Sequence, residues 1–455
     1  MAAFLVDSID GSILNIAIPV ISRTLNIPPL SLKLAVTAYL LSMGVFIPVS
    51  GWMADRFGSR NVFAAAVAIF GLSSVVAGLS VNLPMLVVAR LVQGFGGAMM
   101  VPVGRLIILR EYAPSRFVKA MNLIVLLALI GNALAPMLGG VIIAFFSWRW
   151  IFFVNLPFSL VMIVLVWRYI KDDPVAECKP FAWKGFFLLG MGLAFVLFGF
   201  SALGQAVGGV RSDVLMVVLG VLFLASYVLF QGRKHNAVIN PRIFDQKNFR
   251  RGVTFAFLMR LGLQSVGFVM SLLLQLVLGY TPLQAAFYLS FGVVGMMLAK
   301  LAIRFFLRHF SLRSIVVSNG TLIACIILSF TTLGATTPQW QYILSFGLFG
   351  FCLSSQFTCL QIVNYADVKT SLKSQVTSFA SAMQNVAKSF SIAIAALLLG
   401  LLSSVHGASY DMAIGGFHDV FVILAAIVLV FSWCFLFLDR QVGASLTAYS
   451  VKNTA

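Results

Sequence analysis

The sequence predicts an all-α integral membrane protein, and three observations support this fold class. Of its 455 residues, 61% are hydrophobic and 10% are charged, whereas a soluble domain carries about 25% charged residues. Apolar runs of about 18 or more residues recur along almost the whole chain, and each can cross a bilayer as a helix. Strict alternation of apolar and polar residues is missing, which favours helices over a β-barrel.

The apolar runs predict about fourteen membrane spans joined by short connections. The approximate ranges are 2–22, 34–53, 62–80, 84–108, 118–143, 150–168, 184–204, 213–231, 253–278, 283–303, 314–333, 340–362, 378–404 and 417–438. None of the connections is long enough for a soluble domain. Catalysis in an extramembrane domain is therefore excluded, and we expect no enzyme.

The basic residues give the orientation of these spans. Most of the 31 lysines and arginines fall in loops on one side of the membrane if the N-terminus is cytoplasmic. Because positive loops stay inside and the span number is even, both termini are expected in the cytoplasm. The net charge of +18 then reflects topology and attraction to anionic lipids. It does not indicate a nucleic-acid partner.

The connection between the second and third spans is a short charged hinge. Gly51 is expected to let helices approach closely, and Gly58 to permit a tight turn with positive φ. Asp55 can accept hydrogen bonds at a helix N-terminus, where the helix dipole favours an anion. Arg56 and Arg60 have two interpretations: they belong to a gate, or they only follow the positive-inside rule.

A faint internal repeat relates this hinge to a later one. The segment 55–60 can be aligned with 308–313, and both are basic hinges on the predicted cytoplasmic side. Such a repeat suits a transporter built from two similar halves. It predicts a six-helix bundle over residues 1–170, a two-helix insert with a linker over 171–250, and a second six-helix bundle with a short tail over 251–455.

Two acidic residues lie in the first span. Asp7 and Asp10 are three residues apart and share a helix face. A carboxylate within a membrane span is costly and is by default a functional candidate. In apolar surroundings it can take up and release a proton near neutral pH. The alternatives are a structural ion pair or exposure at the cytoplasmic edge.

Arg90, in the fourth span, is the basic residue expected to act with these acids. Its guanidinium stays charged and cannot carry the proton, but it can drive a proton off a nearby carboxylate. The alternative is that Arg90 extends its side chain to the outer surface. Gln93 shares its helix face and is expected to line the cavity.

The second half of the chain has basic residues within its spans. Arg260 and Lys388 are expected deep in the membrane, whereas Lys300 is expected near the interface. An excess of cations favours an anionic substrate, such as a carboxylate metabolite or a metal chelate. Gln356 and Asn385 are further candidates for a cavity lining, although helix packing also explains them.

Small residues mark one face of the fifth span. Gly131, Ala135 and Gly139 recur every four residues, and Gly140 follows, which makes a smooth stripe for tight helix packing. Pro136 removes one backbone hydrogen bond and bends the helix.

Taken in order, these motifs resemble the major facilitator superfamily, and within it the fourteen-helix drug:proton antiporters (EmrB/QacA type, MdtD-like branch). The hinge reads G-x-x-x-D-R-x-G-x-R over 51–60. The other matching segments are 10–19, 37–41, 90–98, 96–106, 131–140, 148–157 and 275–282. The likeness covers nearly the whole chain and is weaker in the second half.

The resemblance implies a major facilitator fold, with two six-helix bundles and a two-helix central insert. It implies proton-coupled export of drugs or small metabolites across a bacterial inner membrane by alternating access. Asp10 and Arg90, with Asp7, would couple the proton, the hinge would lock one state, and 131–140 would be the antiporter motif. Two departures are that Ala135 replaces the usual glycine and that few residues precede Asp10.

The implied partners are the bilayer, protons and a small-molecule substrate, with no cofactor and no metal. A periplasmic adaptor is left open, and proton-coupled uptake is the alternative direction of transport. A channel would need a ring of like residues or a repeated filter. An intramembrane enzyme would need a catalytic motif such as H-E-x-x-H or G-x-S-x-G. The sequence contains neither, so a transporter is favoured over both.

Overall fold

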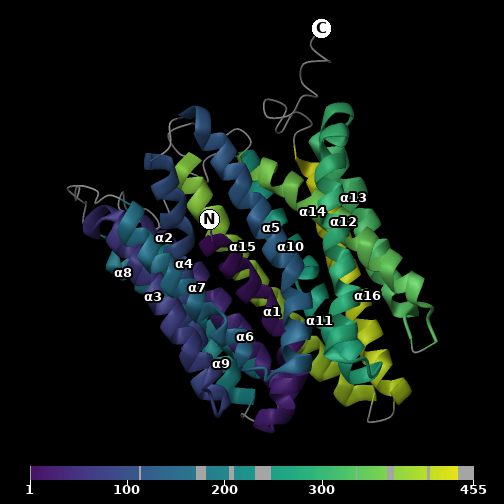
Figure 1. Ribbon diagram of the computed structural model, residues 1–455. Helices are drawn as coiled ribbons and strands as arrows, with labels where there is room; N and C mark the ends of the chain where they lie inside the picture. The colour runs from purple at the N-terminus through teal and green to yellow at the C-terminus, as the bar shows by residue number, and fades with distance from the viewer. Residues whose placement is uncertain are drawn as a thin grey trace. The chain divides into compact units, whose positions relative to one another are not determined.

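The protein is helical throughout the part of the chain that the structure describes. The computed structural model describes residues 2–111, 114–170, 181–203, 210–230, 247–334, 336–365, 373–406 and 410–438. Within these ranges no strand occurs (Figure 1). Among them, 13 helical segments are long and apolar enough to cross a membrane. The predicted all-α membrane fold is therefore confirmed. The remaining predicted span, 118–143, lies within the helix α5, Pro114–Phe145.

The chain divides into two compact units. Unit 1 comprises Met1–Ile239 and Thr281–Ala286, and unit 2 comprises Asn240–Tyr280 and Phe287–Ala455. The helices of unit 1 are α1 (Ala2–Leu25), α2 (Lys33–Phe57), α3 (Ser59–Gly78), α4 (Leu83–Glu111), α5, α6 (Trp150–Phe153), α7 (Asn155–Tyr169), α8 (Trp183–Leu203) and α9 (Val210–Phe230). Within this unit α4 packs against α2 and α3, α1 against α5, and α7 against α3. The first, third, fourth and sixth predicted spans are thereby brought together.

Unit 2 repeats this order of spans. Its helices are α10 (Lys247–Leu263), α11 (Val266–Leu272), α12 (Pro282–His309, which begins in unit 1), α13 (Leu312–Ser329), α14 (Gln339–Tyr365), α15 (Lys373–His406) and α16 (Tyr410–Cys434). Here α13 packs against α14 and α16, and α10 packs against α14, α15 and α16. The segment 55–60 joins α2 to α3, and the segment 308–313 joins α12 to α13.

The first span of unit 2 departs from the prediction of one continuous helix over 253–278. The helix breaks after Leu263 and resumes at Val266, and a π-helical turn follows at Leu273–Val277. Gly262 and Gly267 lie on either side of the break, and glycine weakens a helix interior. This residue choice accounts for a break at that place.

The hinge between α2 and α3 is shorter than the sequence suggested. The helix α2 continues to Phe57, and Gly58 alone, with φ 81°, separates it from α3. The expected tight turn with positive φ is therefore present. Gly51 needs a correction: it is exposed, and a Cβ there would meet nothing within 4 Å. Among the described residues no neighbouring atom lies close to that Cβ, so the expected close helix packing at Gly51 is not observed.

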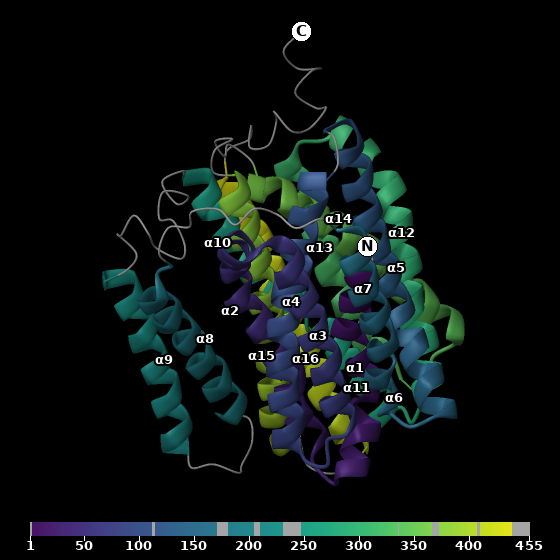
Figure 2. The same ribbon diagram turned by 60° about the vertical axis from the view of Figure 1, so that its left-hand side comes forward.

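The helices α8 and α9 lie side by side as a pair (Figure 2). An aromatic cluster joins α8 to the end of α2. The ring of Trp52 lies 5.3 Å from that of Phe181 and 5.6 Å from that of Trp183. The domain boundaries predicted at 170–171 and 250–251 stay a prediction. The segments 171–180 and 231–246 lie outside the described residues.

Candidate functional site

The interior of unit 1 contains a buried ion pair. Asp10 on α1 and Arg90 on α4 each have 1% of their side-chain surface exposed. The Arg90 Nη1 donates to Asp10 Oδ2 at 2.6 Å. The expectation that Arg90 acts with an acid of the first span holds in this geometry, and extension of Arg90 to the outer surface does not occur.

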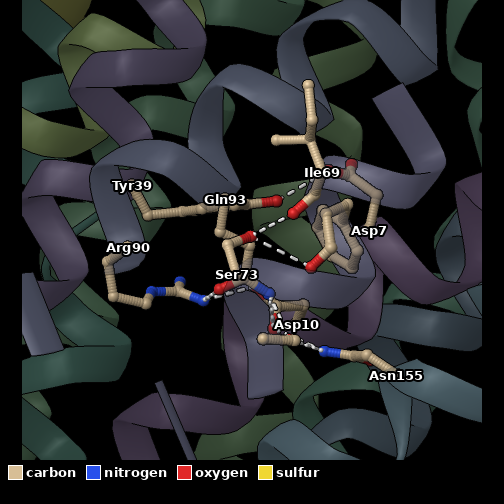
Figure 3. Close-up of polar contacts among 10 residues, drawn as sticks. Asp7, Asp10, Tyr39, Ile69, Ser73, Arg90, Gln93 and Asn155 are labelled. Atoms are coloured by element: carbon tan, nitrogen blue, oxygen red, sulfur yellow. Dashed lines mark hydrogen bonds and ion pairs between the residues drawn. The ribbon is translucent and has the colours of Figure 1, made fainter. Parts of the chain in front are cut away.

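Uncharged polar side chains complete the surroundings of this pair, as Figure 3 shows. Gln93 and Asn155 donate to Asp10 Oδ1, each at 3.0 Å. The same two side chains donate to Ser74 Oγ at 2.7 and 2.9 Å. The four helices α1, α3, α4 and α7 therefore meet at one network. We call Asp10, Ser74, Arg90, Gln93 and Asn155 the Asp10 cluster.

The Asp10 carboxylate is enclosed by hydrogen-bond donors. The carboxylate accepts one charge-assisted bond from the guanidinium and one bond from each of two amides. A buried pair of this kind is costly to break, because removing one partner leaves a buried charge and destabilises by about 3–5 kcal/mol. The Arg90 Nε is buried without a partner among the described residues. The guanidinium thus keeps a spare donor.

Tyr39 on α2 connects the second acid to this cluster. Its hydroxyl donates to Asp7 Oδ1 at 2.8 Å, and the Arg90 Cζ lies 4.1 Å from the centre of its ring. A cation over a ring face is attracted by the ring quadrupole. A Cβ on Gly94 would collide with the Tyr39 carbonyl oxygen, and one on Gly97 would lie 3.3 Å from both Asp7 Oδ1 and the Tyr39 hydroxyl. The sequence of α4 thus makes room for Tyr39.

The small-residue stripe of α5 packs against α1, the helix of both acids. A Cβ on Gly131 would lie 2.9 Å from the Leu5 carbonyl oxygen, and one on Gly139 would lie 2.8 Å from Ile13. Ala135 and Gly140 are buried, and Pro136 lies inside the helix. The predicted tight helix packing is therefore observed, with α1 as the partner of the first part of the stripe.

The charged residues of the hinge contact aromatic rings. The Arg56 Cζ lies 5.6 Å from the ring centre of Trp52, and the Arg60 Cζ lies 4.3 Å from that of Trp167 on α7. Asp55 is half-buried on the last turn of α2. The gating role predicted for the hinge stays a prediction.

A neutral counterpart of the Asp10 cluster lies in unit 2. Gln356 Nε2 lies 3.3 Å from Met259 Sδ, and Gln356 Oε1 accepts from Asn319 Nδ2 at 2.7 Å. Ser432 Oγ lies 3.7 Å from the same sulfur. These four residues, the Met259 cluster, come from the first, third, fourth and sixth spans of unit 2, as the Asp10 cluster does in unit 1.

Two predicted cavity residues lie in the interior of their units. Gln93 and Gln356 are both fully buried, with 0% exposure. Their amides are used within the two clusters, since each joins three helices of its own unit. The expectation that they line a cavity stays a prediction.

The remaining predicted residues lie in unit 2. Arg260 is buried on α10, and its Cζ lies 6.0 Å from the ring centre of Phe357. Asn385 donates to the Ser381 carbonyl oxygen within α15 at 3.3 Å, and Lys388 is half-buried on the same helix. Among the described residues, no group of three His, Cys, Asp or Glu side chains could hold a metal ion.

Ser74, Tyr39 and Asn155 were not identified from the sequence. Ser74 is one of many serines in apolar helices, and only the family-like segments 37–41 and 148–157 point toward the other two.

Comparisons with known proteins agree with one another on the family of this chain. The profile of the Major Facilitator Superfamily matches residues 1–392. A relative from Pectobacterium atrosepticum, named for multidrug resistance (MdtD), is 31% identical over 439 residues, which cover 94% of this chain and 93% of the relative. A relative from Haemophilus influenzae, named as a transport protein (HsrA), is 30% identical over 447 residues, covering 98% and 96%.

Solved structures show the same fold. The D-xylose–proton symporter has a TM-score of 0.66 at 14% identity and covers 97% of each chain. The nucleoside transporter NupG has a TM-score of 0.63 at 16% identity, covering 96% of this chain and 97% of that one. At this level of identity the likeness concerns the fold alone.

Proposed function

Because the chain belongs to the Major Facilitator Superfamily and is a membrane transporter rather than an enzyme, we propose that it is a proton-coupled antiporter. It exports drugs or small metabolites across the bacterial inner membrane, with both termini in the cytoplasm. The relative named for multidrug resistance supports this class of cargo. The observation that supports proton coupling is the buried Asp10–Arg90 pair.

Asp10 is the proton carrier in this proposal. A proton on Asp10 removes the charge that holds Arg90, so the guanidinium loses its strongest partner. Arg90 already lies over the Tyr39 ring, and Tyr39 is bonded to Asp7. If the Arg90 guanidinium leaves Asp10, a small movement can therefore bring it to a second carboxylate, that of Asp7. Arg90 and Tyr39 act as positioning residues, and Asp7 is the second carboxylate.

The packing of α1 links this event to a change of state. Protonation loosens α1 from α4, and α1 also packs tightly on the small residues of α5. A shift of α1 is then shared by helices throughout unit 1. We propose that alternating access follows from this shift, with the hinge at 51–60 as the gate. The direction of the proton gradient decides between export and uptake.

Transport in proteoliposomes with an imposed pH gradient tests this proposal, with ethidium and 2-naphthoate each offered as the probe and proton flux recorded together with the flux of the probe. We expect Asp10→Asn to abolish the proton-coupled flux, and Asp419→Asn, a carboxylate of unit 2 outside the Asp10 cluster, to leave it unchanged. Proton-coupled transport at the wild-type rate in Asp10→Asn would exclude Asp10 as the carrier. Transport in the wild type that is indifferent to the gradient would exclude proton coupling.

A further inference from the structure

One stretch of α14 has a narrow accessible window. Between Cys352 and Leu360, every residue is buried except Phe357 and Thr358, which are half-buried. Two basic side chains from other helices of unit 2 approach α14 at these two positions. Because consecutive helix residues point about 100° apart, the two cations approach α14 at the same level from directions about a quarter-turn apart. We call Phe357 and Thr358 the α14 window.

The first cation is Arg260 on α10. Only 4% of its surface is exposed. Its guanidinium faces the Phe357 ring, 6.0 Å from Cζ to the ring centre. No carboxylate among the described residues pairs with it. Arg90, which is equally well buried, is paired with Asp10 at 2.6 Å. A buried guanidinium that lacks an anion is the exception, since buried charges are normally paired.

The second cation is Lys300 on α12. Its Nζ donates to Thr358 Oγ1 at 2.8 Å. The Thr358 hydroxyl donates in turn to the Ser354 carbonyl oxygen at 2.9 Å. The lysine is therefore oriented toward the α14 window by a neutral hydroxyl, which satisfies one of its three donors and leaves its charge unbalanced.

Asp419 does not compensate these charges. Among the described carboxylates of unit 2, the one in the spans is Asp419 on α16. Ser432 of the same helix contacts Met259, the neighbour of Arg260. At 1.5 Å per residue, Asp419 lies about 20 Å along α16 from that level. The positive potential at the α14 window is thus not cancelled from within the described part of unit 2.

We propose that Arg260 and Lys300 form an anion-binding site at the α14 window, and that the transported substrate is an organic anion. The carboxylate, sulfonate or phosphate head of the anion would bind the planar fork of Arg260 and the ammonium of Lys300. Its apolar or aryl body would lie against Phe357. The substrate assignment rests on the proposed function, because it treats the bound anion as the molecule that is transported. An anionic lipid headgroup has the same head chemistry, so the test must separate the two sources.

Binding of 2-naphthoate to the full-length protein in nanodiscs of zwitterionic lipid tests the site. Its neutral amide, 2-naphthamide, has the same aryl body without the charge. We expect naphthoate to bind, and Arg260→Gln and Lys300→Gln each to weaken its binding by about tenfold, the size of one lost charge-assisted bond. The amide should bind weakly and equally to all forms.

Two further variants keep the result interpretable. Arg260→Lys preserves the charge and should retain most of the affinity. Arg313→Gln removes a basic residue of unit 2 whose Nη1 donates to the Leu438 carbonyl oxygen outside the α14 window, and it should bind naphthoate normally. Equal affinity in Arg260→Gln and the wild type would overturn the site. If Arg313→Gln weakened naphthoate binding as much as Arg260→Gln does, that result would also overturn the site.

The same nanodiscs prepared with added phosphatidylglycerol distinguish substrate from lipid. If the site serves a substrate, naphthoate affinity changes little when the anionic lipid is present. Binding of phosphatidylglycerol that depends on Arg260 and excludes naphthoate would overturn the substrate assignment. We expect Asp10→Asn to lose proton coupling and to bind naphthoate as the wild type does. Naphthoate binding without any proton coupling in the wild type would contradict the proposed function and leave the site standing.

Discussion

The Asp10 cluster of unit 1 and the Met259 cluster of unit 2 occupy the same four spans of their respective halves. In each, a glutamine of the fourth span joins the first span to the third, and a short polar side chain of the sixth span contacts the first. The difference is charge: the first span contributes a carboxylate in unit 1 and a thioether in unit 2. Three residues before the glutamine stands Arg90 in one case and Leu353 in the other.

A buried polar network can hold helices together, or it can take part in the transport cycle. The difference in charge separates these two roles. The Met259 cluster shows that amides, hydroxyls and a sulfur are enough to join these helices. The ion pair of the Asp10 cluster is therefore not required to hold such a bundle together. Since buried ion pairs contribute little to stability relative to apolar substitutes, a role in the transport cycle is the better reason for it.

The largest effect is expected when the Asp10 cluster is converted to the composition of its counterpart. Asp10→Met combined with Arg90→Leu should still fold, since an apolar pair of similar volume replaces an ion pair at little cost. Its Tm should fall moderately, because the buried amides of Gln93 and Asn155 each lose a bond to Asp10, at about 1–3 kcal/mol for each unpaired group. Proton-coupled transport should be lost entirely. Transport and thermal unfolding of the purified double variant would be measured together.

Two single substitutions, one in each cluster, supply the controls for this conversion. Asp10→Met alone leaves the Arg90 charge buried and should cost about 3–5 kcal/mol of stability. Met259→Leu, the matched change in unit 2, should cost less than about 1.5 kcal/mol and leave transport intact. A double variant that transports normally would show that the two clusters have the same role.

A smaller effect is expected for the tyrosine that joins Asp7 to Arg90. Tyr39→Phe removes one hydroxyl and keeps the ring under the guanidinium, so the rate should fall by about tenfold, the value of one hydrogen bond to a charged group. The pH profile of transport should change in the same way as in Asp7→Asn, and the double variant should show no further change.

In unit 2, Tyr342→Phe removes a buried hydroxyl that donates to the Gly334 carbonyl oxygen. It should lower Tm slightly and leave the pH profile unaltered. An identical response of the two variants would argue against a special role for Tyr39.

The smallest effect is expected at the two hinges. Gly58→Ala places a Cβ at φ 81° and should cost about 1–3 kcal/mol of backbone strain. In unit 2 the corresponding junction uses Ser311, whose Oγ accepts from the Ser314 backbone N–H at 3.2 Å. Ser311→Ala should cost about 1 kcal/mol through loss of this helix cap. If the first hinge is a gate, Gly58→Ala slows transport, whereas Ser311→Ala lowers only Tm. Equal slowing by both would contradict the gate.

Much of the fold could be predicted from the sequence because membrane spans depend on local composition. The helices, the order of the spans and the turn at Gly58 follow from apolar runs and from the backbone freedom of one residue. The break after Leu263 was not predicted, although Gly262 and Gly267 flank it, since glycine is also tolerated within continuous membrane helices. Close packing at Gly51 was predicted wrongly, because a small residue permits a close approach but does not supply a partner.

The candidate site was predicted only where charge marks it. Asp10 and Arg90 stand out because ionisable residues are rare within spans, and helix periodicity placed Gln93 beside Arg90. Ser74 and Asn155 carry no such mark, since uncharged polar side chains are common in membrane helices. The site proposed at Arg260 and Lys300 depends on two contacts with α14 from distant segments, which neither local pattern nor spacing reveals.

The most direct test of the central claim is the protonation of Asp10 itself. Infrared difference spectra of the protein in nanodiscs, recorded between low and high pH, show the C=O stretch of protonated carboxyl groups. We expect a buried carboxyl band that titrates in the wild type, persists in Asp419→Asn and disappears in Asp10→Asn. A titrating band of the same frequency and amplitude in Asp10→Asn would contradict it.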